Sequence, residues 1–299
     1  MVADLFRRQL GEDTPWDWRP APEEARRHRI QLHWDGKGVG YFQRHSHTLV
    51  PVMSCPAAAD PISLAIPRLK EAILGRNLPT RSGRWELSTG TPANRVLATD
   101  EQGRTWELEP DGWHKNDQPL LHRLGDHQLR HEPGAFFQVC APWAAQAFGD
   151  LLTEWDLRGS TLYDLYGGVG LFSILLGDRF QHRVLVESGE AAVAWARKNL
   201  EAAALPSECI VADVAAWVTE GLGQPQDVIL LDPPREGLEA SLCERLQQAK
   251  AGRMVLVGCD GAAFCRDLKA LAPRWRIQSV AALDLFPHTS HVEFLALLV

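Results

Sequence analysis

The chain has 299 residues, of which 45% are hydrophobic and 23% are charged, and its formal net charge at pH 7 is −7. A chain of this length and composition can bury a substantial core, and it predicts a soluble, globular protein of one large domain or two moderate ones. No apolar run reaches the roughly 18 residues that span a bilayer, and the first residues contain no hydrophobic signal region. We therefore expect a cytoplasmic protein that does not bind a membrane.

The charge is distributed unevenly along the chain. Residues 1–130 carry 18 Lys and Arg against 17 Asp and Glu, whereas residues 131–299 carry 13 against 21. Seven of the eleven histidines also lie in the first part. The first part is therefore the one expected to face the phosphates of a nucleic acid. An ordinary solvated surface explains the same counts.

The first part of the chain has the texture of a small α+β module. Residues 1–25, rich in Trp, Pro and Glu, predict an irregular lead-in segment. Strand-like, turn-rich sequence follows over residues 29–113, with a hairpin predicted around residues 101–103. One helix interrupts it, because Asp60 and Pro61 supply an N-terminal cap and an early proline ahead of a helical apolar spacing that ends at Leu74.

From about residue 134 onward, helices alternate with short, fully apolar strands. We predict helices over residues 143–155, 171–176, 190–203 and 238–249, and strands over residues 162–165, 183–186, 209–211, 227–231 and 253–257. Continuous apolar strands with helical crossovers form a parallel sheet that is covered on both faces.

The chain closes with two extended runs, residues 275–283 and 292–299, which suit an antiparallel pair on the edge of that sheet. This arrangement is typical of the class I methyltransferase variant of the doubly wound, Rossmann-like α/β fold. We therefore predict two domains, an N-terminal α+β domain over residues 1–130 that binds the substrate and a methyltransferase domain over residues 131–299.

A glycine-rich turn, Asp164-Leu-Tyr-Gly-Gly-Val-Gly170, follows the first strand of the predicted sheet. Gly168 and Gly170 allow a sharp turn and a close approach of a cofactor, and the next helix offers its N-terminal amides. A purely structural turn would look the same. However, Glu187 ends the second strand, where a carboxylate can accept both hydroxyls of a ribose, and Asp213 follows the third. Together these positions predict a nucleoside cofactor.

An acidic proline turn, Asp232-Pro-Pro-Arg235, follows another apolar strand. In enzymes that methylate the amino groups of adenine or cytosine, a comparable turn ends in an aromatic residue that stacks on the base. Here Arg235 stands in that place, where it could hold a phosphate or a carbonyl. Asp232 could contact the substrate base or the charged cofactor. A rigid turn without a chemical role is the alternative.

Cys259 follows a core strand, at the place where an open sheet positions its ligands. A thiolate there could add to C6 of a pyrimidine, so that C5 becomes nucleophilic and attacks the methyl sulfonium of S-adenosylmethionine. A base must then remove the C5 proton, and Glu293, at the start of the last strand, is the natural candidate. An ordinary surface glutamate is the alternative. Cys209, Cys243 and Cys265 fit small buried hydrophobes better.

The ordered segments resemble the RNA uracil-5 methyltransferase family, which makes 5-methyluridine in transfer and ribosomal RNA. They are Pro133-Gly-Ala-Phe-Phe-Gln-Val139, Asp164-Leu-Tyr-Gly-Gly-Val-Gly-Leu-Phe-Ser173, Asp232-Pro-Pro-Arg-Glu-Gly237, Cys259-Asp260 and Leu285-Phe-Pro-His-Thr-Ser-His-Val-Glu293. The similarity runs from about residue 29 to the end and is strongest from residue 133.

The resemblance implies S-adenosylmethionine as the cofactor and RNA, not DNA, as the partner. It also implies that Cys259 is the nucleophile and Glu293 the general base. The residues that would line the cofactor site are Gln138, Tyr166, Glu187, Asp213 and Asp232. The resemblance implies no oligomeric state, and it does not indicate which RNA or uridine is modified.

The sequence departs from the family's usual pattern in several places. The family usually shows Ser-Cys-Asp-Pro around its nucleophile, where this chain has Gly258-Cys-Asp-Gly261. We expect no counterpart of the N-terminal RNA-binding barrel ahead of Arg29. Among the iron–sulfur cysteines of ribosomal RNA members only Cys55 has a possible match, and one ligand cannot hold a cluster, so no metal is expected. The spacing of the six cysteines favours free thiols.

Two other functions are compatible with these motifs. One is a methyltransferase of the same fold that acts on another base, a protein or a small molecule. The other is an RNA-binding relative that has lost turnover, which the altered turn around Cys259 would permit.

Overall fold

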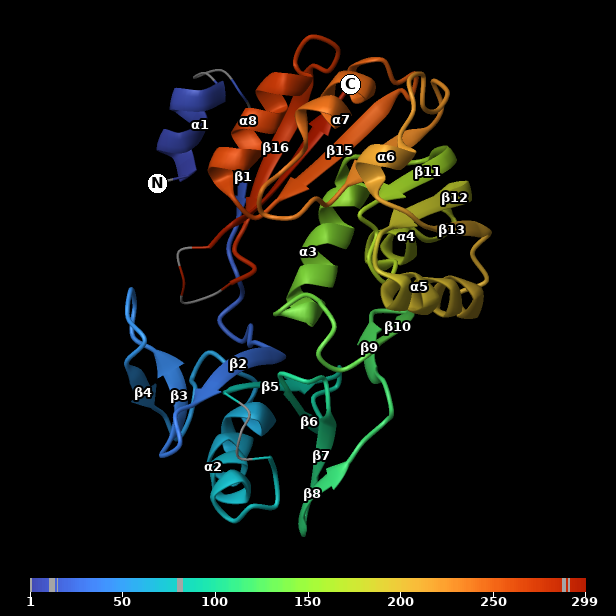
Figure 1. Cartoon of the computed structure of the whole chain (residues 1–299). Helices are drawn as coiled ribbons and strands as arrows, with labels where there is room; N and C mark the ends of the chain where they lie inside the picture. The colour runs from blue at the N-terminus through green and yellow to red at the C-terminus, as the bar shows by residue number, and fades with distance from the viewer. Residues whose placement is uncertain (1, 11–13, 15, 80–82, 287–288, 290) are drawn as a thin grey trace. The chain divides into compact units, whose positions relative to one another are not determined.

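The computed structural model describes residues 2–10, 14, 16–79, 83–286, 289 and 291–299 (Figure 1). The chain forms two compact units. The large unit comprises Met1–Pro22 and Ala145–Val299, and the small unit comprises Glu23–Ala144. The chain therefore passes between the units twice. The functional division at residue 130 stays a prediction.

The large unit is an α/β structure, and its elements alternate along the chain. They are α1 (Val2–Leu10), β1 (Trp16–Arg19), most of α3 (Ala141–Glu154), β11 (Gly159–Leu165), α4 (Leu171–Leu175), a 3-10 turn (Gly177–Arg179), β12 (Phe180–Glu187), α5 (Glu190–Ala202), β13 (Ser207–Val211), α6 (Val214–Trp217), β14 (Val228–Leu231), α7 (Ala240–Gln247), β15 (Arg253–Gly258), α8 (Gly261–Leu271), β16 (Ile277–Leu283) and β17 (Glu293–Leu298).

The strands of the large unit form one eight-stranded sheet in the order β1-β16-β17-β15-β14-β11-β12-β13. β17 pairs antiparallel with β15 and β16, and the other pairs are parallel. The predicted doubly wound sheet and its final antiparallel pair are thus confirmed. The pair does not form the edge, however, because β1 lies outside β16, at the opposite end of the sheet from β13 (Figure 1).

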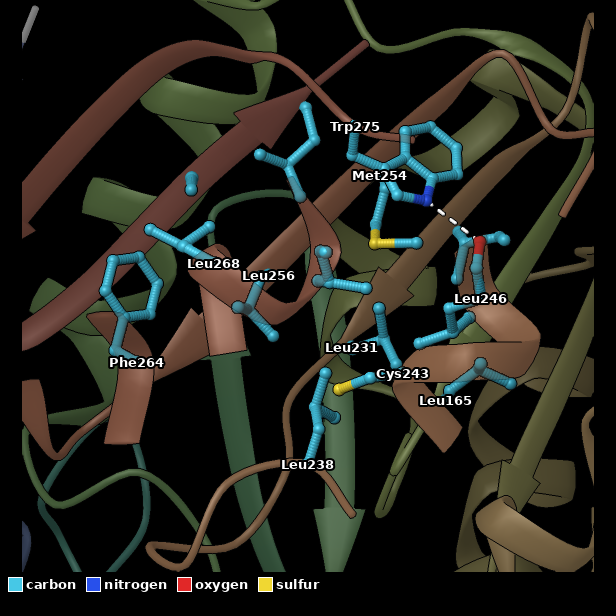
Figure 2. Close-up of a cluster of buried hydrophobic side chains, with 14 of the residues drawn as sticks. Leu165, Leu231, Leu238, Cys243, Leu246, Met254, Leu256, Phe264, Leu268 and Trp275 are labelled. Atoms are coloured by element: carbon cyan, nitrogen blue, oxygen red, sulfur yellow. Dashed lines mark hydrogen bonds between the residues drawn. The ribbon is translucent and has the colours of Figure 1, made fainter. Parts of the chain in front are cut away.

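Helices cover both faces of this sheet. On one face, alternate apolar residues of neighbouring strands, such as Leu165, Leu231 and Leu256, pack with α7 and α8 in a cluster shown in Figure 2. The Trp275 indole N–H in this cluster donates to the Leu246 carbonyl at 2.9 Å. α4 lies on the other face, since the intervening β11 residue Asp164 bonds to its Ser173.

Residues 2–10 form helix α1 and residues 16–19 form strand β1, so the prediction of an irregular lead-in is wrong for these described residues. Phe6 of α1 is 1% exposed, and its ring contacts those of Phe294 and Trp16 at 5.5 and 5.6 Å. β1 covers the outer edge of β16 with Trp16 beside Val280. Phe294 and β16, which pack against Phe6 and β1, lie more than 250 residues away in the sequence, so local composition carries no signal for these contacts.

The small unit is an antiparallel sheet with one helix on one face, together with a separate hairpin of β9 and β10. The order in the sheet is β4-β3-β2-β5-β6-β7-β8. Its elements are β2 (Arg29–Trp34), β3 (Val39–Phe42), β4 (Leu49–Pro51), α2 (Asp60–Leu74), β5 (Arg84–Thr89), β6 (Val96–Asp100), β7 (Thr105–Glu109), β8 (Gly112–Lys115), β9 (Leu120–Leu124) and β10 (His127–His131).

The predicted helix and hairpin of the small unit are both confirmed, as α2 and as the antiparallel β6–β7 pair. The helix buries Ile62, Ile66 and Leu69 completely against the sheet. The prediction of Asp60 as the N-terminal cap of this helix is wrong. The N-cap residue is Ala59, which makes no side-chain hydrogen bond, and Asp60 lies in the first turn. Among the described helices, none has the length and apolar character that a membrane crossing requires.

Candidate active site

The predicted catalytic residues meet at one edge of the large sheet. β17 runs antiparallel to β15, and Gly258 is paired with Phe294, so Cys259 and Glu293 are level on neighbouring strands. On the other side of β15, β14 ends at Leu231 beside Leu256, and Asp232 follows it directly. Because β17 is reversed, the first residue of this strand joins the carboxyl ends of the parallel strands.

The turn that carries Cys259 is fixed by the helix that follows it. The Asp260 carboxylate caps α8, accepting the amides of Ala262 and Ala263 at 3.0 and 2.9 Å. A Cβ on Gly258 would lie 3.1 Å from the Phe264 ring, which gives a physical reason for glycine before the cysteine. Gly258 and Gly261, which replace the serine and proline of the usual family pattern, therefore lie in a turn that is capped by Asp260 and packed against Phe264.

The thiol of Cys259 is partly buried and lies among charged groups. Burial raises its pKa most, and the Glu293 carboxylate raises it further. Arg235 opposes both effects through its charge and a hydrogen bond to the thiol, which lower the pKa. A thiolate that formed here would therefore have a guanidinium counter-ion. Arg235 itself is exposed.

Glu293 is 5% exposed at the start of β17. Burial holds its pKa well above the ordinary range, the Asp232 charge raises it further, and Arg235 lowers it in part. A carboxylate with a raised pKa is a stronger base than one in water, which suits the removal of a carbon-bound proton.

Further carboxyl groups gather at the same edge. The pKa of Asp232 is raised to about 7, first by burial and then by the charges of Asp164 and Glu187. That of Asp164 is also raised to about 7 by burial, although Ser173 donates to its Oδ2 through its amide at 3.1 Å and its hydroxyl at 2.5 Å. Within the described residues, the buried Oδ1 of Asp164 has no hydrogen-bond partner.

The glycine turn after β11 is open on one side and packed on the other. Tyr166, Gly168 and Gly170 have φ of 60°, 52° and 91°, and the left-handed conformation costs Tyr166 roughly 1 kcal/mol. A Cβ on Gly167 would lie 2.6 Å from the Leu185 side chain, whereas one on Gly168 would meet nothing within 4 Å. The backbone can therefore admit a ligand at Gly168.

Glu187 ends β12 and faces this turn. Its Oε2 accepts the Gly168 amide at 3.3 Å, and its Oε1 accepts the Gly189 amide at 2.8 Å. Each carboxylate oxygen has two acceptor sites, so Oε2 can accept a further hydroxyl. Glu187 therefore lies at the end of its strand, as predicted, and its carboxylate can still accept a hydrogen bond from a ribose hydroxyl.

Two other predicted cofactor residues occupy different environments. Asp213 is exposed and caps α6 by accepting the Ala216 amide at 2.8 Å. It lies close to Tyr166, whose pKa is raised to about 12 by burial first and the Asp213 charge second. A cavity of about 750 Å³ borders Asp213 and is also lined by Glu239 and Arg245.

Gln138 belongs to the small unit, between β10 and α3, and is partly buried. Phe137 beside it packs against His122 and His131, with ring centroids at 4.6 and 4.7 Å. The contact of Gln138 with the cofactor stays a prediction. His288 and Ser290, within the last family segment, lie outside the described residues.

Sequence reasoning missed two features of this edge, the buried Asp164 carboxyl and the capping role of Asp260. Each left a signal: an acid in an otherwise apolar strand, and an aspartate directly before a helical apolar pattern. All six cysteines are free thiols. Cys243 and Cys265 are buried, but Cys209 is only partly buried, contrary to prediction, because β13 is one of the two edge strands of the sheet.

Comparisons with known proteins agree with this geometry. Residues 223–299 match the family model described as tRNA (Uracil-5-)-methyltransferase. The chain is 36% identical to the tRNA (uracil(54)-C(5))-methyltransferase of Pyrococcus abyssi, covering 94% of this chain and 76% of that protein. It is 30% identical to the 23S rRNA (uracil(1939)-C(5))-methyltransferase RlmD of Pseudomonas fluorescens strain Pf0-1, covering 99% and 72%.

A solved structure extends the likeness to three dimensions. The crystal structure of the Pyrococcus abyssi tRNA (uracil-54, C5)-methyltransferase in complex with S-adenosyl-L-homocysteine matches with a TM-score of 0.81 at 27% identity, over 100% of this chain and 82% of that one. The sheet order, the glycine turn and this match define a class I methyltransferase that uses S-adenosylmethionine. The chain belongs to the RNA uracil-C5 methyltransferase family. The predicted fold class, enzyme class and cofactor are confirmed.

Proposed function

We propose that this enzyme methylates C5 of a uridine in transfer or ribosomal RNA through a covalent bond between Cys259 and C6 of the base. The observation that carries the proposal is the level placement of Cys259, directly after β15, and Glu293, the first residue of β17, with the Arg235 charge lowering the pKa of the thiol. Relatives that act on uridines of tRNA and of 23S rRNA both resemble the chain, so both RNA classes are candidates.

Cys259 begins the reaction as a thiolate. Arg235 favours this form, and the sulfur adds to C6 of the uracil while the π electrons move through C5 to the C4 carbonyl. C5 becomes nucleophilic, and the cofactor supplies the methyl group from a positively charged sulfur. Glu293 then takes the proton from C5, the C5–C6 double bond re-forms, and the bond from C6 to the Cys259 sulfur breaks.

The residues at the sheet edge fit a cationic nucleoside cofactor. The Glu187 charge raises the pKa values of Asp164 and Asp232, Asp164 also raises that of Asp232, and Asp232 raises that of Glu293, whereas the Arg235 guanidinium lowers those of Cys259 and Glu293. A sulfonium would lower the cost of keeping these carboxylates ionised. The proposed cofactor residues are Gln138, Tyr166, Gly168, Gly170, Glu187, Asp213 and Asp232.

Individual contacts follow from the geometry of these residues. Glu187 would accept ribose hydroxyls with the free capacity of its Oε2. Gly168 and Gly170 would leave room for the ligand at the turn. Asp232 would lie toward the sulfonium, since it stands between the Glu187 side of the edge and Glu293. The small unit would hold the RNA.

The test is covalent trapping with RNA that contains 5-fluorouridine. Fluorine replaces the C5 proton, so elimination stops and a protein–RNA adduct persists on a denaturing gel. The wild-type protein should form the adduct in the presence of S-adenosylmethionine. Cys259→Ala should form none while binding the cofactor normally, because the thiol acts on the base.

Cys265→Ala is the matched control, since Cys265 is buried on α8 six positions further along. This variant should keep most of the trapping and most of the methyl transfer. Trapping in Cys259→Ala, or an equal loss in both variants that fold normally, would contradict covalent catalysis by Cys259.

A further inference from the structure

The charge of the small unit is concentrated at one end of its sheet. Residues 26–84 carry ten Lys and Arg against three Asp and Glu, whereas residues 85–126 carry four against eight. The first stretch builds β2, β3, β4 and α2, and the second builds most of β5 and all of β6 to β9. Figure 1 shows β3 and β4 at one end of this sheet and β7 and β8 at the other. Arg68 of α2 bonds to the Glu109 carbonyl beside β8, so the helix does not belong to the β4 end. The strand segment at that end, residues 26–51, is positive by itself, with five Lys and Arg against one Asp.

An exposed aromatic ring lies at this positive end. In β2 and β3, Leu32 and Val39 are buried in the core beneath α2, so strand alternation places His33 and Phe42 on the opposite face. Phe42 is 41% exposed, and its ring stacks on that of His33 at 4.0 Å. His47 meets the Phe42 ring with its edge at 5.7 Å. Two imidazoles thus hold a phenyl ring that remains open to solvent.

The loop that follows Phe42 presents further basic groups. Residues 42–48 are all exposed, and they include Arg44, His45 and His47 but no acid. Hydrogen bonds within the loop order it, since the Gln43 amide donates to the Thr48 carbonyl at 2.9 Å. These side chains are therefore displayed on a defined turn.

The carboxylates nearest this face in the sequence and in the sheet already have partners. Glu86 accepts from Arg29 at 2.6 Å and is mostly buried, and Asp35 accepts the amides of Lys37 and Gly38 at 2.9 Å each. Arg84 stands beside His33 in register, and burial and this positive charge together lower the pKa of His33. The charge of Glu86, which would repel a phosphate, is thus neutralised by Arg29, and the Asp35 carboxylate is bonded to the backbone of its own turn.

We propose that His33, Phe42, Arg44 and His47, the Phe42 platform, bind an unpaired nucleotide of the substrate RNA away from the catalytic edge. Phe42 would stack on a base, since every base has a π face, and Arg44 would contact the neighbouring phosphate. The platform rests on RNA as the substrate, but not on the covalent mechanism. It provides a second contact that positions the RNA while a uridine occupies the large unit.

The experiment measures binding of the full-length protein to two fluorescein-labelled probes by anisotropy, a single-stranded oligouridylate and a fully paired RNA duplex of equal length. Stacking of one base contributes about 1–3 kcal/mol, so Phe42→Ala should weaken oligouridylate binding by roughly 5- to 150-fold. Phe42→Trp should keep it. Leu64→Ala, at a position 73% exposed on α2 of the same unit, should change nothing.

The two probes and a salt titration separate stacking from charge. Phe42→Ala should bind the duplex as the wild type does and should keep the salt dependence of oligouridylate binding. Arg44→Ala should reduce the slope of log affinity against log salt by roughly 0.7. Wild-type affinity of Phe42→Ala for oligouridylate, or an equal loss with Leu64→Ala or with the duplex, would overturn the platform. So would a wild-type protein that does not bind oligouridylate.

Trapping with saturating 5-fluorouridine RNA reports on the catalytic edge separately. Phe42→Ala should reach the wild-type amount of adduct under this condition, because saturation compensates for weaker binding. Failure of the wild-type protein to trap would refute the covalent mechanism while leaving the binding result valid. Normal trapping together with unchanged binding in Phe42→Ala would refute the platform alone.

Discussion

The protonation state of Asp232 should set how tightly the enzyme binds S-adenosylmethionine. The pKa of this carboxyl is raised to about 7 by burial and by the charges of Asp164 and Glu187. If the sulfonium lies beside Asp232, the cation stabilises the ionised carboxylate, and binding below pH 7 must release a proton. Affinity should therefore fall as the pH falls through 7.

The size of this effect follows from the pKa. With a pKa of about 7, Asp232 is about nine-tenths ionised at pH 8 and about one-tenth ionised at pH 6. The affinity should accordingly drop about tenfold between these values, or about 1.4 kcal/mol. S-Adenosylhomocysteine has a neutral thioether in place of the sulfonium, so its affinity should fall much less between these pH values. Asp232→Asn should bind S-adenosylmethionine weakly at both pH values.

Isothermal titration calorimetry at pH 6, 7 and 8, in two buffers with different ionisation enthalpies, measures both the affinity and the protons released. A pH-independent affinity in the wild-type protein would refute the reasoning, as would equal pH dependence for the two ligands. A dependence that persists in Asp232→Asn would assign the proton to another group. In the protein without cofactor, a rise in pH has the opposite effect, on stability. Asp232 ionises near pH 4 in the unfolded chain but only near pH 7 in its buried site, so the free energy of unfolding falls as the pH rises from about 4 to about 7.

Glu187→Ala should weaken S-adenosylmethionine binding at least tenfold, because it removes charge-assisted hydrogen bonds, and an unchanged calorimetric affinity in the folded variant would remove Glu187 from the site. Glu293→Gln should let methylated RNA accumulate while still bonded to Cys259, visible as a slow band on a denaturing gel; wild-type turnover without that band would place the base elsewhere. Burial lowers the pKa of His131 to about 4 and that of His122 to about 2, so stability present above about pH 6.5 should be lost on acidification, by about 2 kcal/mol for His131 between pH 7 and pH 5. Denaturant unfolding at both pH values tests this, and an equal loss in His131→Gln would contradict it.

Much of the large sheet could be predicted because its strands are short, continuous and apolar. Leu162–Leu165 and Met254–Val257 lie within β11 and β15 as expected from that pattern. The first strand could not be predicted, since Trp16 to Arg19 forms a strand only by pairing with β16 at the other end of the chain. Long-range pairing leaves no local periodicity to detect.

The candidate site divides in the same way. Cys259 and Glu293 could be placed together because each stands at the end of a strand whose direction the sequence indicates. The effect of Arg235 on the pKa of the thiol depends on the shape of the proline turn, which residue types alone do not determine. The raised pKa of Asp164 needs the complete burial that only tertiary packing provides.

The first strand has a consequence for how the protein is assembled. Because β1 belongs to the large sheet, residues 23–144 are inserted between two parts of one fold and are joined to it at both ends. An inserted unit has two covalent connections, which restrict its rotation more than a single linker would. If this insert holds the RNA as proposed, its exchange between relatives that keep a glutamine at the position of Gln138 should change the RNA that is bound without altering the sheet that carries Cys259 and Glu293. Because the second boundary, Ala144, lies within the first turn of α3, a chimera would place its second junction just before Ala141 and keep the helix whole.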